Sequence, residues 1–132
     1  MDNIKKGDKM EKNEIYKCEI CGNIVELITV GGGELVCCGQ PMDLMPEQTA
    51  DFANEKHVPM IEESESGIII KVGSTEHPMT EDHHIEWIQI IDGEKIERKF
   101  LRAGEKPEAE FQTKNKNVIA REYCNVHGLW RN

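Results

Sequence analysis

The sequence has few aromatic residues, no long apolar run and no excess of positive charge. Phe, Trp and Tyr make up only 5% of its 132 residues, so a core over residues 58–130 must be built mainly from Val, Ile and Leu. No apolar run is long enough to cross a bilayer, and residues 1–14 lack the apolar stretch of a signal peptide. The formal net charge of −9 argues against nucleic acid as a partner. We therefore expect a cytoplasmic protein with no membrane segment.

The sequence also lacks sustained helical periodicity and internal repeats. Short apolar runs alternate with turn signals instead, and the Asp92-Gly93 pair is a typical hairpin turn. Such a pattern favours an all-β fold, with an antiparallel β-sandwich of roughly seven strands over residues 50–132. The ranges expected to form strands there are 68–73, 85–91, 96–101, 108–113 and 118–123.

The first third has a different organisation. Residues 1–14 are polar and are expected to form a flexible extension, and residues 15–49 a small metal-binding domain that ends in a linker from Pro41 to Thr49. Within it we expect a strand over 24–30, a glycine turn, and a return strand leading into the second pair of cysteines. A part of about 45 residues cannot bury a useful core, so it needs a metal or another staple.

Four of the five cysteines form one potential metal site in this first third. Cys18 and Cys21 lie in a Cys-x-x-Cys motif, and Cys37 and Cys38 are adjacent. The cytoplasm keeps thiols reduced, and an odd count leaves one thiol over, so ligands are favoured over disulfides. Four thiolates suit either structural zinc or a redox-active single iron. Adjacent cysteines cannot span a tetrahedral edge without local bending, so we expect a distorted site.

The histidines and the fifth cysteine form a second set of potential ligands. Two histidines lie close to prolines, which keep the chain extended and leave the rings on loops. Two others are consecutive at the start of a strand, where side chains point to opposite faces, so at most one of them reaches a shared ion. A cysteine and a histidine three residues apart form a compact two-ligand turn. The candidate ligands are His57, His77, His83 or His84, Cys124 and His127.

Four imidazoles and one thiolate are one donor more than zinc normally takes in proteins. Five donors suit iron in a square-based geometry with one open position. A thiolate opposite that position would push electron density toward a bound ligand, as in thiolate-ligated haem. The set therefore predicts electron transfer to a small ligand.

Together these segments closely resemble desulfoferrodoxin, the two-iron class of superoxide reductase. The resemblance runs from about Ile15 to Trp130 and keeps the family order and spacing. It rests on Tyr-Lys-Cys-Glu-Ile-Cys-Gly-Asn, Glu-Leu-Val-Cys-Cys-Gly, Glu-Lys-His-Val-Pro, His-Pro-Met, His-Ile-Glu-Trp-Ile and Arg-Glu-Tyr-Cys-Asn-Val-His-Gly-Leu-Trp.

The resemblance implies a small desulforedoxin-like domain followed by an immunoglobulin-like catalytic domain of the neelaredoxin type, with one iron in each. Aligning Ile85 and Trp87 with the family assigns the third histidine ligand to His83 and makes His84 a non-ligand. The implied ligands of the first iron are Cys18, Cys21, Cys37 and Cys38. Those of the catalytic ferrous iron are His57, His77, His83 and His127 in a plane and Cys124 on the axis.

The implied activity is one-electron reduction of superoxide to hydrogen peroxide, with uptake of two protons and no release of dioxygen. Lys56, beside His57, would draw the anion in and help deliver protons through water, and Glu55 would occupy the vacant position on oxidised iron. The family also implies rubredoxin as electron donor and a homodimer. The alternative is a non-catalytic rubredoxin-like electron carrier or zinc-binding module, in which the four-cysteine site is the working centre.

Overall fold

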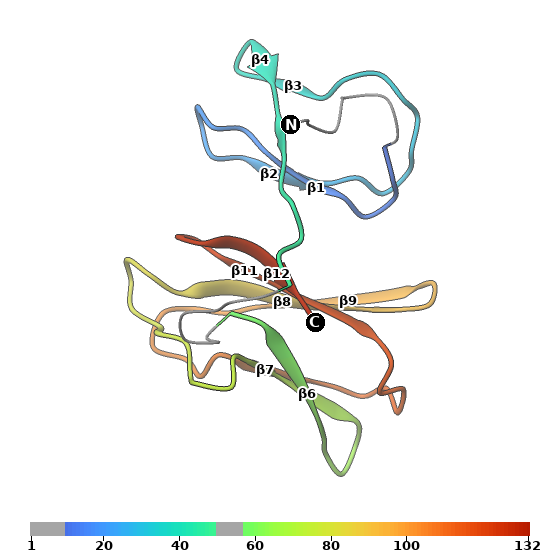
Figure 1. The fold of residues 1–132 in the computed structure, drawn as a ribbon, viewed down its shortest axis with the longest axis vertical. Helices are drawn as coiled ribbons and strands as arrows, with labels where there is room; N and C mark the ends of the chain where they lie inside the picture. The colour runs from blue at the N-terminus through green and yellow to red at the C-terminus, as the bar shows by residue number, and fades with distance from the viewer. Residues whose placement is uncertain (1–9, 50–56) are drawn as a thin grey trace. The chain divides into compact units, whose positions relative to one another are not determined.

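The computed structural model describes residues 10–49 and 57–132, and it divides into two compact units, Met1–Pro46 and Glu47–Asn132. All regular elements in the described residues are short β-strands (Figure 1). No helix in that part of the chain could cross a membrane. The expected all-β class is thus confirmed. Residues 1–9 of the expected extension, and residues 50–56, lie outside the described residues.

The first unit is built from two small antiparallel ribbons. Strand β1 (Ile15–Lys17) lies between β2 (Ile24–Glu26) and β5 (Asp43–Leu44), and β3 (Val36–Cys37) pairs with β4 (Gln40–Pro41). Each ribbon turns at a pair of cysteines, so the strands serve mainly to position thiols.

The predicted strands on the two sides of the glycine turn are present as β2 and β3, but they are shorter than expected and do not pair with each other. The strand expected over 24–30 ends at Glu26 and pairs with β1, because the Cys-x-x-Cys segment folds back on itself: Cys18 N–H donates to Asn23 O, and Gly22 N–H donates to Cys18 O, both at 2.8 Å. The part of the expected linker around Met42 also belongs to the folded unit, since Met42 is 5% exposed.

The core of this unit is small. Its buried members are Tyr16, Cys18 and Met42, with Met10, Leu27, Leu35, Cys37 and Leu44 packed against them. Residues close to the end of the expected extension are attached to it, since Asn13 N–H donates to Leu27 O at 2.6 Å. A core of this size that includes a potential ligand, Cys18, supports the expectation that the unit needs a metal.

The second unit is a sandwich of two antiparallel sheets, as predicted. In Figure 1 the layer of β8, β9, β11 and β12 lies above the layer that contains β6 and β7. The sheet order is β10-β7-β6 in one layer and β12-β11-β8-β9 in the other. The strands are β6 (Pro59–Glu63), β7 (Ile68–Val72), β8 (Ile85–Asp92), β9 (Lys95–Phe100), β10 (Glu108–Phe111), β11 (Ile119–Cys124) and β12 (Gly128–Arg131).

The five strands predicted from sequence are confirmed, with small differences at their ends, whereas β6 and β12 were not predicted. The core is aliphatic, as the shortage of aromatic residues requires. Its buried members are Ile68, Ile70, Val72, Ile85, Ile88, Ile90, Leu101, Ala109, Phe111, Val118, Ala120 and Cys124.

One irregularity in the sandwich positions the second set of ligands. The register between β8 and β11 shifts next to Cys124, which lies opposite Ile85, so that Glu86 is an extra residue on β8. A bulge of this kind resets which side of a strand each residue faces. Ile85 consequently faces the core together with Ile88, despite their odd spacing. The start of β8, which follows the consecutive histidines, is thereby directed toward Cys124.

Candidate metal centres

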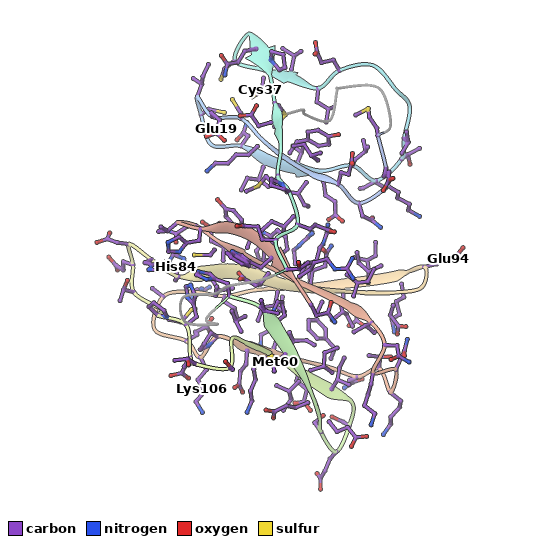
Figure 2. The ribbon with its side chains drawn as sticks, in the orientation of Figure 1. Glu19, Cys37, Met60, His84, Glu94 and Lys106 are labelled. Atoms are coloured by element: carbon purple, nitrogen blue, oxygen red, sulfur yellow. The ribbon has the colours of Figure 1, made fainter. Side chains whose placement is uncertain are left out.

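The four cysteines of the first unit converge on one point. Their sulfur atoms all lie within 4.8 Å of one another, and Cys21 Sγ is 3.6 Å from Cys37 Sγ. Figure 2 labels Cys37 in this unit, with further sulfur atoms drawn close to it. All the cysteines of the chain are free thiols. The set can therefore close on a single ion, and the disulfide alternative is not what the structure contains.

The local bend expected at the adjacent cysteines is present. Cys38 has a φ of 55°, in the left-handed region, and Gly39 follows with a φ of 79°. A left-handed conformation costs a non-glycine residue roughly 1–2 kcal/mol. Binding of an ion by all four thiolates would offset this cost.

The thiols of the first site cannot all ionise without a cation. Backbone N–H groups, first that of Cys21, lower the pKa of Cys18 to about 7. Hydrogen bonds with the thiols of Cys21 and Cys18 raise the pKa of Cys38 to about 12. A bound divalent or trivalent cation removes this obstacle, because it stabilises all four thiolates at once. Cys21 and Cys38 are exposed, so one edge of the site is accessible from solvent.

The second site gathers residues that are distant in sequence. His57 precedes β6, His77 lies between β7 and β8, His83 precedes β8, and Cys124 ends β11. The potential ligand atoms of these four residues all lie within 4.8 Å of one another. His127 is close to the same point, since its Nδ1 is 3.1 Å from His57 Nε2 and 3.9 Å from Cys124 Sγ. The structure thus brings together all five residues expected from the sequence.

The four imidazoles form a closed cycle, each ring packed edge-to-face against two others. The centroid distances are 4.8 Å for His57–His77, 4.7 Å for His77–His83, 5.0 Å for His83–His127 and 4.7 Å for His57–His127. The interplanar angles lie between 69° and 82°. Four ring nitrogens with one sulfur beside them are the square-based donor set that the sequence predicted for iron.

The surroundings of His77 favour a neutral imidazole with a free lone pair. Its Nδ1 donates to Pro78 O at 2.6 Å, which leaves a lone pair on Nε2. Within the described residues that buried Nε2 has no hydrogen-bond partner. Burial lowers the pKa of His77 to about 4, so the ring stays neutral at physiological pH. A buried nitrogen with a lone pair and no partner fits a metal ion.

Cys124 also suits an ion. It is fully buried, and burial raises the pKa of its thiol, opposed by the backbone N–H groups of His127 and Val126. His127 N–H lies 3.4 Å from the sulfur. A bound cation would make the thiolate the favoured form.

Two further side chains support the histidine cycle. The indole of Trp130 stacks on His57, with a centroid distance of 4.6 Å and an interplanar angle of 15°. Its Nε1 donates to His127 O at 3.2 Å, and Gln48 Nε2 donates to the same oxygen at 2.9 Å. Trp130 and Gln48 therefore hold two members of the cycle, and no local sequence pattern indicates either role.

Of the remaining predicted site residues, only His84 lies in the described part of the chain. The Nδ1 of His84 lies 3.0 Å from Thr80 O, a hydrogen bond outside the cycle, in agreement with its assignment as a non-ligand. Glu55 and Lys56 lie outside the described residues.

Sequence reasoning missed Glu122, which precedes Cys124 by two residues on β11. It is fully buried, and its carboxylate oxygens have no hydrogen-bond partner among the described residues. Burial raises its pKa well above the ordinary value. Strand alternation was the available signal, because Ala120, Glu122 and Cys124 share a face.

Acidification should destabilise the metal-free protein through His77. Its pKa of about 4 in the folded protein lies below the ordinary 6.5, so the unfolded chain binds the proton more tightly. The stability contributed by neutral His77 is fully present above about pH 6.5 and declines as the pH falls toward 4. Urea unfolding across this range gives the free energy of unfolding of metal-free wild type and of metal-free His77→Gln. The advantage of wild type over the variant should become smaller as the pH falls from 6.5 toward 4. A difference that stays constant with pH would contradict the expectation.

Family models match both units of the chain. The model described as desulfoferrodoxin, N-terminal domain, matches residues 10–45, and the desulfoferrodoxin model matches residues 49–132. The desulfoferrodoxin of Syntrophotalea carbinolica is 58% identical over 120 residues, which cover 91% of this chain and 95% of that protein. The desulfoferrodoxin of Nitratidesulfovibrio vulgaris is 57% identical over 118 residues, covering 89% and 94%.

A solved structure matches across both units. The superoxide reductase of Treponema pallidum has a TM-score of 0.73 and 29% identity, covering 90% of this chain and 96% of that one. The superoxide reductase of Pyrococcus abyssi is 36% identical over 104 residues, covering 64% of this chain and 90% of that protein. The matched family models, the sequence identities and the two ligand sets show that the chain belongs to the desulfoferrodoxin family.

Proposed function

We propose that this chain is a superoxide reductase, which reduces superoxide by one electron to hydrogen peroxide and so removes a reactive oxygen species. The observation that carries the proposal is the closed cycle of four imidazoles beside the Cys124 sulfur. Five donors leave a six-coordinate ion one position for a small ligand. Relatives named superoxide reductase, among them those of Treponema pallidum and Pyrococcus abyssi, support the same activity.

Each chain holds two irons, one bound by four cysteines and one by four histidines and a cysteine. The proposed ligands of the first are Cys18, Cys21, Cys37 and Cys38, and those of the second are His57, His77, His83, His127 and Cys124. When bound, ferrous iron at the second centre supplies the electron and the open position for superoxide. The protein contributes four imidazoles and a buried sulfur whose electron density favours transfer to the bound anion.

Lys56 attracts superoxide and helps to deliver the two protons through water. The support is its place in the chain, since it is joined to His57 and its ammonium group cannot coordinate iron. A unit charge at ~6 Å, at an effective dielectric near 20, contributes about 2–3 kcal/mol. Acidic groups beyond a Debye length of about 8 Å are screened, so one lysine can outweigh the net charge of −9. Glu55, the neighbour of Lys56 in the chain, would supply a carboxylate oxygen as a donor for oxidised iron.

The electron donor is rubredoxin, the protein is a homodimer, and it works in the cytoplasm. Cys21 and Cys38 are exposed. They lie close to Ile20 and Val36, which have 60% and 57% of their surface accessible, so this edge offers a small protein a place to exchange electrons with the first centre.

The small core of the first unit supports pairing with a second copy. The free thiols support a reducing compartment.

The competing function is a non-catalytic electron carrier or zinc-binding module. The four-cysteine site alone would serve either role. Neither role uses a cycle of four histidines beside a buried thiol, which makes enzymatic reduction the better account of the second unit.

The test is to mix anaerobically reduced protein with superoxide and to follow superoxide decay, after counting the metals. If the chain is a superoxide reductase, we expect two irons per chain, visible absorption from oxidised iron–thiolate centres, and faster loss of superoxide. One iron and one zinc would retain the enzyme but exclude a redox role for the first centre. A colourless zinc protein, or a coloured one that leaves superoxide decay unchanged, would refute the proposal.

A further inference from the structure

Two consecutive histidines lie next to the second site, but only one of their rings belongs to it. His83 belongs to the imidazole cycle, whereas His84 Nδ1 lies against Thr80 O. Both residues are half-buried. Figure 2 shows His84 at the end of the second unit opposite Glu94. A slip of one residue in this short loop would exchange the two rings, so some contact must fix which ring enters the cycle.

The contacts available for this purpose come from Asn125, the residue next to Cys124. Its Oδ1 accepts a hydrogen bond from His84 N–H at 2.9 Å, and its Nδ2 donates to Asp82 O at 3.1 Å. Its backbone N–H donates to His84 O at 3.2 Å. One asparagine thus contacts the residues on both sides of His83, across more than forty positions of sequence.

The rest of the loop is closed locally. Thr80 N–H donates to His83 O at 3.0 Å, and His83 N–H donates to Thr80 O at 3.3 Å. The Thr80 side chain lies 3.2 Å from both polar groups of the His83 backbone. These hydrogen bonds stabilise the turn, but both of their partners lie within the loop. Two sets of contacts set its position relative to the sulfur of Cys124: the pairing of Ile85 with Cys124 between β8 and β11, and the bonds of Asn125 to Asp82 and His84.

We infer that Asn125 is a positioning residue that selects His83 over His84 for the catalytic iron; the inference rests on the proposed function of the second centre. A slip that brought His84 into the cycle would move Asp82 O and His84 N–H away from the amide of Asn125. It would leave that amide and its two backbone partners without their present bonds. Because Asn125 adjoins Cys124, the same amide sets the spacing between the thiolate and the third imidazole.

Asparagine is suited to this task because its side chain both donates and accepts. Alanine removes both bonds. Aspartate keeps the bond from His84 N–H but cannot donate to Asp82 O when ionised. Asn115 provides a matched control, because it precedes β11 as Asn125 follows it, and its Nδ2 donates to Asp92 Oδ1 at 2.9 Å. Asp92 ends β8, so this control lies at the opposite end of that strand from His84.

The test uses the full chain loaded anaerobically with ferrous iron. We expect Asn125→Ala to weaken iron binding at the second centre by about 10–100-fold, the range for losing a partner of a metal ligand. After oxidation, its electron paramagnetic resonance spectrum should contain two ferric signals from the second centre in place of one. Asn125→Asp should show the same changes to a smaller extent, and it serves if the alanine variant does not fold. Asn115→Ala should match wild type in both measurements.

The selection of His83 is tested by adding His84→Phe. In the wild-type background this change should leave iron binding and the spectrum unaltered. In the Asn125→Ala background it should restore a single signal, because only His83 can then bind. A merely structural role for Asn125 would lower stability without this dependence on His84.

The inference is overturned if Asn125→Ala and Asn125→Asp bind iron as tightly as wild type with one unchanged signal. It is also overturned if the second signal persists in the double variant. None of these measurements uses superoxide. A protein that showed the predicted iron binding but did not reduce superoxide would refute the proposed function and leave the role of Asn125 standing.

Discussion

Replacing Cys124 with alanine should abolish superoxide reduction, whereas replacing Cys38 with serine should leave it largely intact. Cys124 is the buried sulfur beside the histidine cycle, and it is expected to supply the electron density that favours transfer. Loss of a partner outside the ligand shell costs about 10–100-fold, so loss of this ligand should cost more. Cys38 belongs to the other ligand set, which we expect to have no open position. The rate of superoxide decay after mixing with each reduced variant makes the comparison.

Metal analysis and the visible spectrum of each variant provide the control. Cys38→Ser should lose the absorption of the four-cysteine centre and keep the iron of the second unit. If that variant kept its second iron but lost turnover, the chemistry would belong to the first unit. If Cys124→Ala reduced superoxide at the wild-type rate, the proposed role of the thiolate would be wrong.

Lys56→Ala should slow the encounter with superoxide more than tenfold while both irons stay bound. Its charge contributes roughly 2–3 kcal/mol of attraction by the Coulomb estimate, before screening by salt. Removing it should also weaken the dependence of the rate on ionic strength, since steering of an anion by a positive charge is salt-sensitive. Pulse radiolysis of the reduced variants at several salt concentrations measures both effects.

Glu55→Ala is the matched control, because it changes the neighbouring residue. A carboxylate that binds only oxidised iron does not attract an anion to the reduced site, so the encounter rate should stay near that of wild type. If Lys56→Ala matched wild type over the whole salt series, the steering role would be refuted.

The ligand sets could be predicted from sequence because their chemistry depends on residue type and short spacing. The Cys-x-x-Cys motif and the Cys-x-x-His turn each place two donors close together whatever the rest of the fold does. The sandwich was also predictable, since runs such as Ile68–Val72 alternate cleanly between buried and half-buried positions. Of the strands that were missed, β6 carries two glutamates, and β12 follows directly after the Cys-x-x-His turn.

What the sequence could not supply depends on register and on contacts between distant segments. The bulge at Glu86 is a relation between β8 and β11, and no local pattern marks it. The contacts of Asn125 with Asp82 and His84, and of Gln48 with His127, likewise join positions far apart in the chain. In the first unit, the turn at the first cysteine pair determined strand pairing, and the more conspicuous glycine turn did not.

The most direct test of the central claim is the product balance when the reduced protein reacts with superoxide. Stopped-flow mixing under anaerobic conditions, followed by assays of hydrogen peroxide and dioxygen, gives this balance. We predict one hydrogen peroxide for each superoxide consumed, no dioxygen beyond that of spontaneous decay, and oxidation of the iron of the second unit. Dioxygen released in a ratio of one to one with hydrogen peroxide, with the iron returned to its starting state, would show dismutation and contradict the account.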